Sequence, residues 1–358
     1  MPPSAPRIDH LRLVQFRSHA LFEMETDTAS LVLVEGANGT GKTNILEALS
    51  LFGFGGRGFR NAATAELHRE GQAAPWGVAV TLDETRYTLM EAPGDTRVFK
   101  IDDSIQKSTP SFGEAAALLW LTPRHDRLFD SSAGDRRRFF DRFVSAFYAG
   151  HSGHLRAYDY RWRERRALFE SGGAVDATWR RVIEQSLAGH AVAIAAARNA
   201  VLTQLQRWLA EPLADFPPAS LGLLGWVEQR CTEQPAVLVE QELLERLERG
   251  ALEGVLLPHQ ADVTALHLGK NAPAHRCSSG EQKAVVMAWL LAEARLLAAE
   301  QERAPILLLD EPFTHLDVTR QGALLEALLA LGCQVWLTDC GTLSAPLPAA
   351  TKRLKLAA

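Results

Sequence analysis

The sequence predicts an α/β protein whose main domain comes from both ends of the chain and encloses an inserted, mainly α-helical domain. Three observations predict this: strand patterns fill the first third of the chain, helical periodicity fills the middle, and alternating helices and strands return towards the end. The expected domains are 1–122 together with 251–358, and an insertion at 123–250. A chain of 358 residues exceeds a single ordinary core, which also favours two domains.

The amino-terminal third is expected to form strands interrupted by one helix. Residues 8–16 (IDHLRLVQF) alternate apolar and polar side chains, and residues 31–35 (LVLVE) form the apolar run of a buried strand. The helix is expected to start at Lys42 and to continue through TNILEALSLF. Three further runs are candidate antiparallel strands: 76–82, 86–91 and 97–101.

The spacing of apolar residues differs between the middle and the end of the chain. Within 123–250, apolar residues recur at spacings of three and four, which indicates helices. After this segment the pattern predicts a long helix from Ser278, a strand at 305–310, a helix from Val318 and a strand at 334–338. The return of this alternation is the reason to join the two ends of the chain into one α/β domain.

Charge is unevenly distributed along the chain. The net charge of −5 argues against a general nucleic-acid coat, but residues 124–207 hold 15 Arg, no Lys and nine acidic residues, a local charge of +6. A basic segment in an acidic protein is typical of a surface that binds a polyanion. Solvated helix faces with internal ion pairs are the alternative explanation.

Composition also limits the compartment and the class of protein. Charged residues interrupt the long apolar runs, so no membrane span is expected, and the amino terminus lacks the apolar core of a signal peptide. The four cysteines form no CxxC pair, which indicates neither a disulfide framework nor a zinc site. We therefore expect a cytoplasmic protein.

The segment GANGTGKT, Gly36–Thr43, carries the strongest functional signal. It matches G-x-x-x-x-G-K-[ST] and lies between a predicted strand and a predicted helix, as a phosphate-binding loop requires. Its N–H groups would surround phosphates, Lys42 would neutralise the β- and γ-phosphate oxygens, and the Thr43 hydroxyl would ligate Mg²⁺. ATP and Mg²⁺ are therefore the expected cofactors. The expected nucleotide-binding residues of this segment are Gly36, Ala37, Asn38, Gly39, Thr40, Gly41, Lys42, Thr43 and Asn44.

The segment ILLLDEP (306–312) supplies two carboxylates. Asp310 and Glu311 follow a buried strand at its carboxyl end, where α/β sheets place their ligands. Asp310 is expected to hold Mg²⁺ through water, as such aspartates do in P-loop NTPases. Glu311 is expected to polarise the attacking water. Glu311 and Lys42 are therefore the expected catalytic residues.

Two shorter motifs precede helices. CSSGEQKA begins the long helix, where Ser278 and Glu281 form a capping box, and HLD precedes the next helix, where Asp317 alone would be an N-cap. The order of phosphate loop, S-x-G-[EQ], DE and LD is that of ABC-type ATPases. In that class the Ser-Gly motif caps the γ-phosphate of ATP held by a second protomer. The order implies that Ser278, Gly280 and Asp317 complete the nucleotide site of a homodimer.

The chain resembles the RecF family of bacterial recombination mediators. The resemblance covers nearly the whole chain and rests most on residues 8–60, 120–145 and 277–317, including LRLVQFRSHALFEME and LTPRHDRLFDSSAGDRRRFFDRFV. It implies an ABC-type P-loop ATPase head with an inserted arm, and ATP-dependent dimerisation on double-stranded DNA near gaps or junctions. It also implies a weak, DNA-dependent ATPase that resets this clamp, and support for RecA loading together with RecR in recombinational repair and replication-fork maintenance.

Some positions depart from the family pattern. Where the family commonly has a His-Arg-Asp-Asp turn, this chain reads LPHQADV, so that His259 and Asp262 are kept and Gln260 replaces the arginine. The side chain that would carry out any function of that arginine is therefore missing at this position. The position that is a histidine in transporter ATPases corresponds to Thr338 or Asp339, which favours slow hydrolysis.

The arginines of the insertion are candidate DNA contacts. Residues one and two apart on a helix do not share a face, so some of these arginines are expected to form internal ion pairs or packing contacts. Contacts to phosphates would be salt-sensitive and largely independent of sequence. The candidates are Arg136, Arg137, Arg138, Arg161 and Arg163.

Two other functions compete with the DNA clamp. One is an ATPase subunit of another SMC- or ABC-type machine that drives a nuclease or a transporter, but the sequence has neither a nuclease-like metal-ligand cluster nor a transmembrane-coupling segment. The other is a nucleotide sensor that binds ATP and never hydrolyses it. The presence of Glu311, which is a candidate for polarising the water that attacks ATP, argues against a protein that never hydrolyses ATP.

Overall fold

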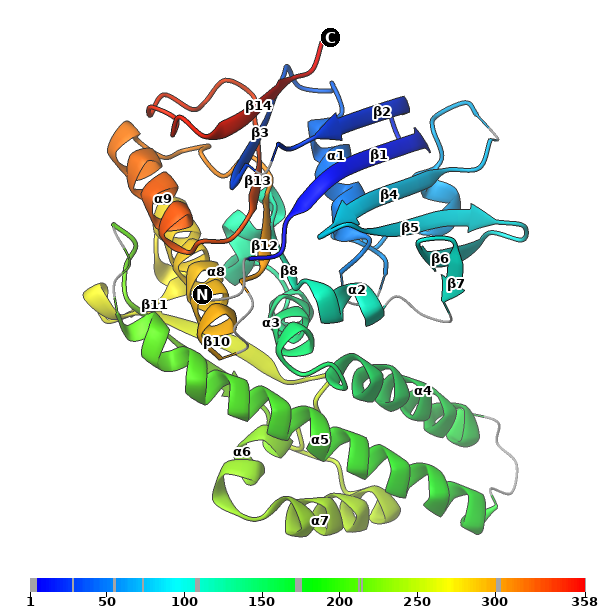
Figure 1. The fold of residues 1–358 in the computed structure, drawn as a ribbon. Helices are drawn as coiled ribbons and strands as arrows, with labels where there is room; N and C mark the ends of the chain where they lie inside the picture. Colours follow the sequence, from blue (N-terminus) through cyan, green and yellow to red (C-terminus); the bar gives the residue numbers. More distant parts are fainter. Residues whose placement is uncertain are drawn as a thin grey trace. The chain divides into compact units, whose positions relative to one another are not determined.

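The structure is a computed structural model that describes all residues except 1–4, 28, 54–55, 73, 107–109, 171–175, 212, 214, 301–303 and 358. The chain divides into two compact units (Figure 1). The first contains Met1–Arg127, Glu211–Pro218 and Ser278–Ala358, and the second contains Leu128–Ala210 and Ala219–Cys277. The first unit is therefore assembled from both ends of the chain, with the second unit inserted.

A six-stranded antiparallel sheet forms one layer of the first unit, in the order β2-β1-β4-β5-β6-β7. The alternation in its first strand corresponds to burial, because Leu11 and Leu13 are buried and Arg12 between them is exposed. The strands are β1 (Ile8–Phe16), β2 (His19–Glu25), β4 (Gly77–Leu82), β5 (Thr85–Ala92), β6 (Thr96–Ile101) and β7 (Ser104–Gln106).

A five-stranded parallel sheet forms the second layer, in the order β14-β3-β13-β12-β8. Its central strands are almost wholly apolar because helices or the other sheet cover both faces. All carboxyl ends of a parallel sheet meet at one edge, which brings the ends of β3, β12 and β13 together. The strands are β3 (Leu31–Glu35), β8 (Leu118–Leu121), β12 (Ile306–Leu309), β13 (Val335–Asp339) and β14 (Thr351–Lys355).

Helices of the first unit cover the parallel sheet. Helix α1 (Lys42–Ser50) packs between the two sheets, and its Ile45 and Leu49 join a core that also contains Leu11 and Trp336. Figure 1 shows α8 and α9 on the other side of the parallel sheet. Helix α8 is buried around most of its circumference, as its apolar composition requires. The remaining helices are α2 (Pro110–Ala115), α8 (Ser279–Glu300) and α9 (Val318–Ala330).

The second unit consists of helices with a small antiparallel sheet, in the order β11-β10-β9. Helices α4 and α5 lie side by side (Figure 1), and Leu187 and Ala191 of α5 share a core with Tyr158 of α4 and Leu243 of α7. The helices are α3 (Ala133–Phe147), α4 (His151–Glu170), α5 (Ala177–Ala210), α6 (Trp226–Glu233) and α7 (Ala236–Arg249). The strands are β9 (Ala219–Leu224), β10 (Asp262–His267) and β11 (Ala272–Pro273).

The sequence-based boundary at residue 250 falls inside the second unit. Strands β10 and β11 follow that residue, but they pair with β9, which precedes it, and so they belong to the same unit as the helices. The return of an α/β pattern after residue 250 is therefore in part the small sheet of the insertion. Among the described residues, none of the helices has both the length and the apolar character needed to cross a membrane.

Candidate nucleotide-binding site

The predicted phosphate loop connects β3 to α1 in the first unit. Gly39 and Gly41 have φ angles of 87° and 93°, which an L-residue rarely adopts. A Cβ atom at Gly41 would also collide with the Ser18 hydroxyl and the His19 ring. Both the backbone conformation and the space therefore require glycine at this position.

Lys42 is buried inside its own loop. Its Nζ donates to the carbonyl oxygens of Gly36, at 2.8 Å, and Ala37, at 3.0 Å. The Thr40 hydroxyl also donates to Ala37, at 2.9 Å. These acceptors are neutral, so they hold the ammonium group without cancelling its charge, and a phosphate would gain a full positive partner here.

Asp310 lies beside Thr43 at the carboxyl end of β12. The Thr43 hydroxyl donates to Asp310 Oδ1 at 2.9 Å, and the Thr338 hydroxyl donates to the same oxygen at 2.8 Å. Burial raises the pKa of Asp310, and the hydrogen bonds from Thr338 and Thr43 oppose that rise. The structure thus brings together the two residues that the sequence assigns to a metal ion, although they are 267 positions apart.

Thr338, rather than Asp339, contacts the acidic pair. Besides donating to Asp310, its hydroxyl accepts a hydrogen bond from the backbone N–H of Glu311 at 2.8 Å. The Asp339 carboxylate instead accepts from the backbone N–H groups of Gly341 and Thr342, and so stabilises the turn after β13. Of the two alternatives left open by the sequence, the structure places Thr338 at the site.

Ser278 and Asp317 are exposed residues at the starts of α8 and α9. The backbone N–H of Ser278 donates to Glu281 Oε2 at 2.9 Å, which is half of the expected capping box. Asp317 caps α9 by accepting a hydrogen bond from the N–H of Arg320 at 2.9 Å. Gly280 has open space where a Cβ would be. In this single chain the three residues serve as helix starts, and their expected role at a second protomer's nucleotide remains a prediction.

A charged network behind the loop was not expected from the sequence. Glu47 of α1 is fully buried, and its carboxylate accepts from Arg17 at 2.6 Å and from Arg60 at 2.7 Å. Arg60 also donates to Asn44 Oδ1, and Asn44 donates to the Ser18 hydroxyl. The network ties α1 to the turn between β1 and β2. Its only sequence signal is a glutamate on the buried face of a short helix, which needs a cationic partner.

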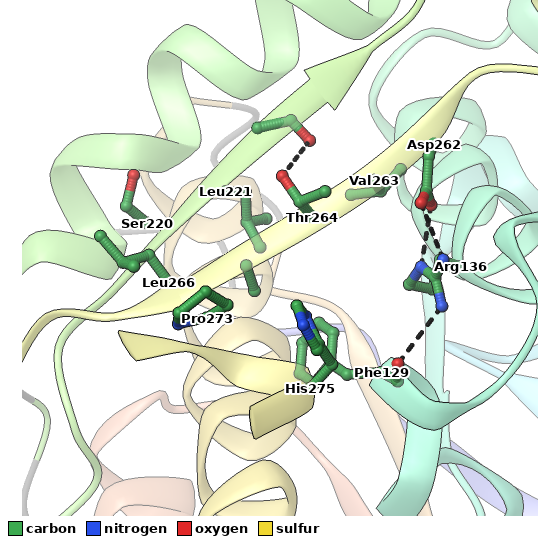
Figure 2. Close-up of a pocket in the computed structure, with 12 residues that line it drawn as sticks. Phe129, Arg136, Ser220, Leu221, Asp262, Val263, Thr264, Leu266, Pro273 and His275 are labelled. Atoms are coloured by element: carbon green, nitrogen blue, oxygen red, sulfur yellow. Dashed lines mark hydrogen bonds and ion pairs between the residues drawn. The ribbon is translucent and has the colours of Figure 1, made fainter. Parts of the chain in front are cut away.

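The five candidate arginines of the second unit have intramolecular partners. Arg136 forms two hydrogen bonds with Asp262, at 2.8 and 2.7 Å, and Figure 2 shows its guanidinium directed at that carboxylate. Arg137 donates to the Ala261 carbonyl oxygen and Arg138 pairs with Asp135. In α4, Arg161 pairs with Glu164, and Arg163 donates to the Asp159 carbonyl oxygen. The expectation that some of these arginines are internal is therefore confirmed.

Exposure separates these arginines. The side chain of Arg136 is only 14% exposed, whereas that of Arg138 is 75% exposed. Arg136 also lines a cavity of about 590 Å³ on the face of the β9–β11 sheet (Figure 2), together with Thr264 and His275. Arg138 is therefore free to reorient towards a phosphate, and Arg136 is not.

The altered turn near residue 260 is packed against the helices. The Tyr158 hydroxyl and His259 Nδ1 share a hydrogen bond of 2.7 Å, and the His259 ring lies 4.5 Å from that of Trp162. Burial and the nearby Arg137 lower the pKa of His259 to about 4, so its imidazole is neutral at pH 7. Gln260, in place of the arginine, accepts a hydrogen bond from the N–H of Leu257. The turn is thus a packed structural element in this chain.

Known proteins are similar to the chain over almost its whole length. A family model described as "AAA domain, putative AbiEii toxin, Type IV TA system" matches residues 31–338. The "DNA replication and repair protein RecF" of Mesorhizobium japonicum is 37% identical, over 94% of this chain and 92% of its own length. The chain belongs to the RecF family. The RecF of Caulobacter vibrioides is likewise 37% identical, over 92% of this chain and 90% of its own length.

Solved structures agree with this RecF-family fold. Two structures of the recombination mediator protein RecF, with ATPrS and with ATP, superpose with TM-scores of 0.82 and 0.79. They are 20% and 21% identical and cover 96% and 94% of this chain, and 95% and 94% of their own chains. An Smc head domain from Pyrococcus furiosus reaches 0.53 at 15% identity over 94% of this chain and 90% of its own. The RecF-family fold is therefore an ABC-type P-loop ATPase head with an inserted helical arm.

Proposed function

We propose that this RecF-family chain is an ATP-gated clamp that closes on double-stranded DNA as a homodimer. One observation carries the proposal: at the predicted phosphate loop, Lys42 and Asp310 both have neutral hydrogen-bond partners, while Ser278 and Asp317 stand at exposed helix starts of the same unit. A second protomer would supply the motif that this site lacks and would receive the same motif in return. This reciprocity is that of a two-fold dimer with two bound nucleotides.

The residues at the site fit MgATP. The glycines of the loop leave the backbone open to phosphate, and Lys42 is held only by carbonyl oxygens that an anion can replace. Thr43 and Asp310 would hold Mg²⁺, directly and through water, which neutralises the phosphate oxygens. Among the described residues, no group of three or more His, Cys, Asp or Glu side chains is arranged to hold a metal ion by itself, so phosphate oxygens and water would complete the coordination.

Glu311 is proposed as the residue that orients the attacking water, and Thr338 as the neighbour that keeps hydrolysis slow. The Thr338 hydroxyl fixes the backbone N–H of Glu311, but a hydroxyl cannot accept and return a proton near pH 7 as a histidine can. The enzyme is therefore proposed to be a weak, DNA-dependent ATPase whose hydrolysis opens the clamp rather than drives a motor.

The biological setting follows from the relatives. The curated relatives are named for DNA replication and repair, and the solved ones are described as recombination mediators of a RecFOR pathway. We extend this to the present chain as binding to duplex DNA at gaps and junctions in the cytoplasm. RecR would be its direct partner and RecA its indirect one.

Sedimentation with and without ATP tests the clamp. Wild-type protein should be monomeric alone and dimeric with ATP and Mg²⁺. Ser278→Ala should bind ATP as a monomer but should not dimerise. Ser132→Ala is the matched control, because Ser132 caps α3 through Asp135 in the other unit and should leave dimerisation unchanged. A wild-type protein that stays monomeric in ATP would refute the clamp.

Two further measurements separate hydrolysis from closure and define the DNA. Glu311→Gln should bind ATP and form a longer-lived dimer, with single-turnover hydrolysis reduced at least about 100-fold. Binding to duplex, single-stranded and gapped DNA, each across a salt series, should show ATP-dependent affinity for duplex and gapped DNA with a steep salt dependence. Equal affinity for single strands with and without ATP would contradict the proposal.

A further inference from the structure

A buried lysine connects two of the motifs in the first unit. Lys283 lies on α8, five residues after Ser278, and its side chain is only 4% exposed. Its Nζ donates to Asp126 Oδ2 at 3.1 Å and to the backbone carbonyl oxygen of Thr314 at 2.9 Å. Thr314 belongs to the segment between the Asp310–Glu311 pair and Asp317. One ammonium group therefore joins the first turns of α8 to that segment.

The ion pair with Asp126 keeps the ammonium in place. A buried charge without a partner is strongly unfavourable, and the Asp126 carboxylate on the 3₁₀ helix Pro123–Asp130 supplies that partner. Burial raises the pKa of Asp126, and the charge of Lys283 opposes that rise. Because Asp126 supplies the opposite charge, and an ammonium group has three N–H donors, another N–H of Lys283 can bond to the Thr314 carbonyl oxygen.

The segment that Lys283 contacts has an unusual backbone. Glu311 and His315 both have left-handed φ angles, 50° and 65°, although neither is glycine. Such conformations persist at functional sites only when surrounding contacts hold them. Thr338 holds the first end of this segment through the N–H of Glu311, and Lys283 holds the second through Thr314, the residue before His315.

We propose that Lys283 is a positioning residue that couples α8 to the segment that leads to Asp317. Ser278 and Asp317 both belong to the surface that would close on the second protomer's ATP, and Lys283 holds the two at a fixed spacing. The inference rests on the proposed dimer for its purpose, but the coupling itself is a property of one protomer. Asp126 is the anchor of the coupling, and Thr314 is its point of action.

Hydrogen exchange on the ATP-free protein tests the coupling without requiring a dimer. The Leu316 N–H donates to the Phe313 carbonyl oxygen at 3.0 Å and so reports the order of the segment. Lys283→Met should make this amide exchange at least about tenfold faster, and Lys283→Arg should restore most of the protection. Lys355→Met, at an exposed lysine of β14 in the same unit, is the control. Unchanged exchange at Leu316 in Lys283→Met would overturn the proposal.

Nucleotide experiments test what the coupling does. Lys283→Met should bind ATP like the wild type, because Lys42 and Thr43 are untouched. Its ATP-induced dimer fraction and its kcat should both fall about tenfold, with KM nearly unchanged. Faster exchange with wild-type dimerisation and kcat would refute the functional coupling. A wild-type protein that fails to dimerise would instead refute the clamp. The exchange experiment would still test whether Lys283 orders the segment around Thr314.

Asp126→Asn keeps the proposal testable if Lys283→Met does not fold. This variant keeps the lysine and the size of its partner but removes the negative charge that anchors it. Exchange at Leu316 should accelerate, to a smaller extent than in Lys283→Met. Wild-type protection and wild-type dimerisation in Asp126→Asn would show that the anchor is not needed, which contradicts the mechanism.

Discussion

The predicted nucleotide site of the first unit and the Arg198 network of the second unit both bury charge, but they compensate it in opposite ways. In the first unit, Lys42 is held by backbone carbonyl oxygens and Asp310 by two hydroxyl groups. In the second, Arg198 of α5 is only 2% exposed and forms ion pairs with Asp141, at 2.7 Å, and Glu228, at 2.6 Å. A buried charged group whose hydrogen-bond partners are neutral can still attract a ligand of opposite charge. A buried charged group that forms an ion pair is already neutralised.

The network of the second unit joins several elements. Arg198 contacts α3 through Asp141, α6 through Glu228, and the turn before β10 through the Pro258 carbonyl oxygen. His151 at the start of α4 completes it, at 3.0 Å from Asp141. Breaking such a network leaves buried charges without partners, which makes it a stability element. The comparison teaches that the partner of a buried charge, rather than its burial, separates a binding group from a structural one.

The largest expected effect is on ATP binding, and it tests the first half of the comparison. Lys42→Ala should reduce binding of ATP below detection in calorimetry. Its thermal midpoint should not fall, because the carbonyl oxygens that Lys42 contacts can be satisfied by water. Lys355→Ala, an exposed lysine of the same unit, should bind like the wild type. A Lys42→Ala protein that binds ATP normally, or that unfolds, would break the comparison.

The second prediction concerns stability of the inserted unit. Arg198→Met should lower the free energy of unfolding by about 3–5 kcal/mol, because Asp141 and Glu228 remain buried without their cation. The control is Arg166→Met, which removes an exposed pair with Glu170 and should cost less than about 1 kcal/mol. Urea denaturation measures both changes. Similar losses in the two variants would show that the network is not the stability element.

The third prediction uses pH to isolate one member of the network. Burial alone would raise the pKa of Asp141, but Arg198 and the hydrogen bond from His151 outweigh burial and lower it to about 2. A depressed carboxyl pKa stabilises the folded state above the unfolded value near 4. That contribution, about 2 kcal/mol, is lost as the pH falls from about 4 to about 2.

Asp141→Asn tests this sign. Its free energy of unfolding should be lower than that of the wild type at pH 5 and should vary less between pH 4 and pH 2.5, so that the two curves approach each other in acid. Urea titrations at several pH values measure the slopes. Parallel curves for the two proteins would mean that another carboxylate controls acid stability.

The smallest expected effect separates two neighbouring arginines of α3. Arg138→Ala should weaken duplex binding a few-fold and reduce the salt slope by about one, as the loss of one phosphate contact does. Arg136→Ala should mainly destabilise the unit, because it leaves Asp262 without its bidentate partner. Filter binding across salt concentrations and thermal unfolding distinguish these outcomes. The reverse pattern would place the DNA contact at Arg136.

Local patterns were sufficient to predict the phosphate loop and most of the parallel sheet. The strands Leu31–Glu35 and Ile306–Leu309 and the helix from Lys42 are where the sequence places them, because apolar runs and the glycine loop determine them over a few residues. The joining of Thr43 to Asp310 was predictable from the topology of a parallel sheet.

Contacts between distant residues were not predictable in the same way. Arg136 and Arg138 look alike in sequence, but the partner of Arg136 lies 126 positions away. Thr338 and Asp339 are adjacent on a strand and point to opposite faces, so register decides which one reaches Asp310. Strands β9 and β10 are short and far apart in sequence, and only their pairing assigns them to the helical unit. Nothing in the local sequence around Lys283 indicates its contact with Thr314, 31 positions away.

Helix α5 has a mechanical consequence. It contains 34 residues, and the part between Ala177 and Arg198 is about 32 Å long at 1.5 Å per residue. A tilt of only about 5° around Arg198 would move the far end of the helix by about 3 Å, which is the length of a hydrogen bond. The charge network of Arg198 therefore lies at the pivot of this motion. The rigidity of the network determines how far a small rearrangement around Arg198 displaces the end of the helix at Ala177.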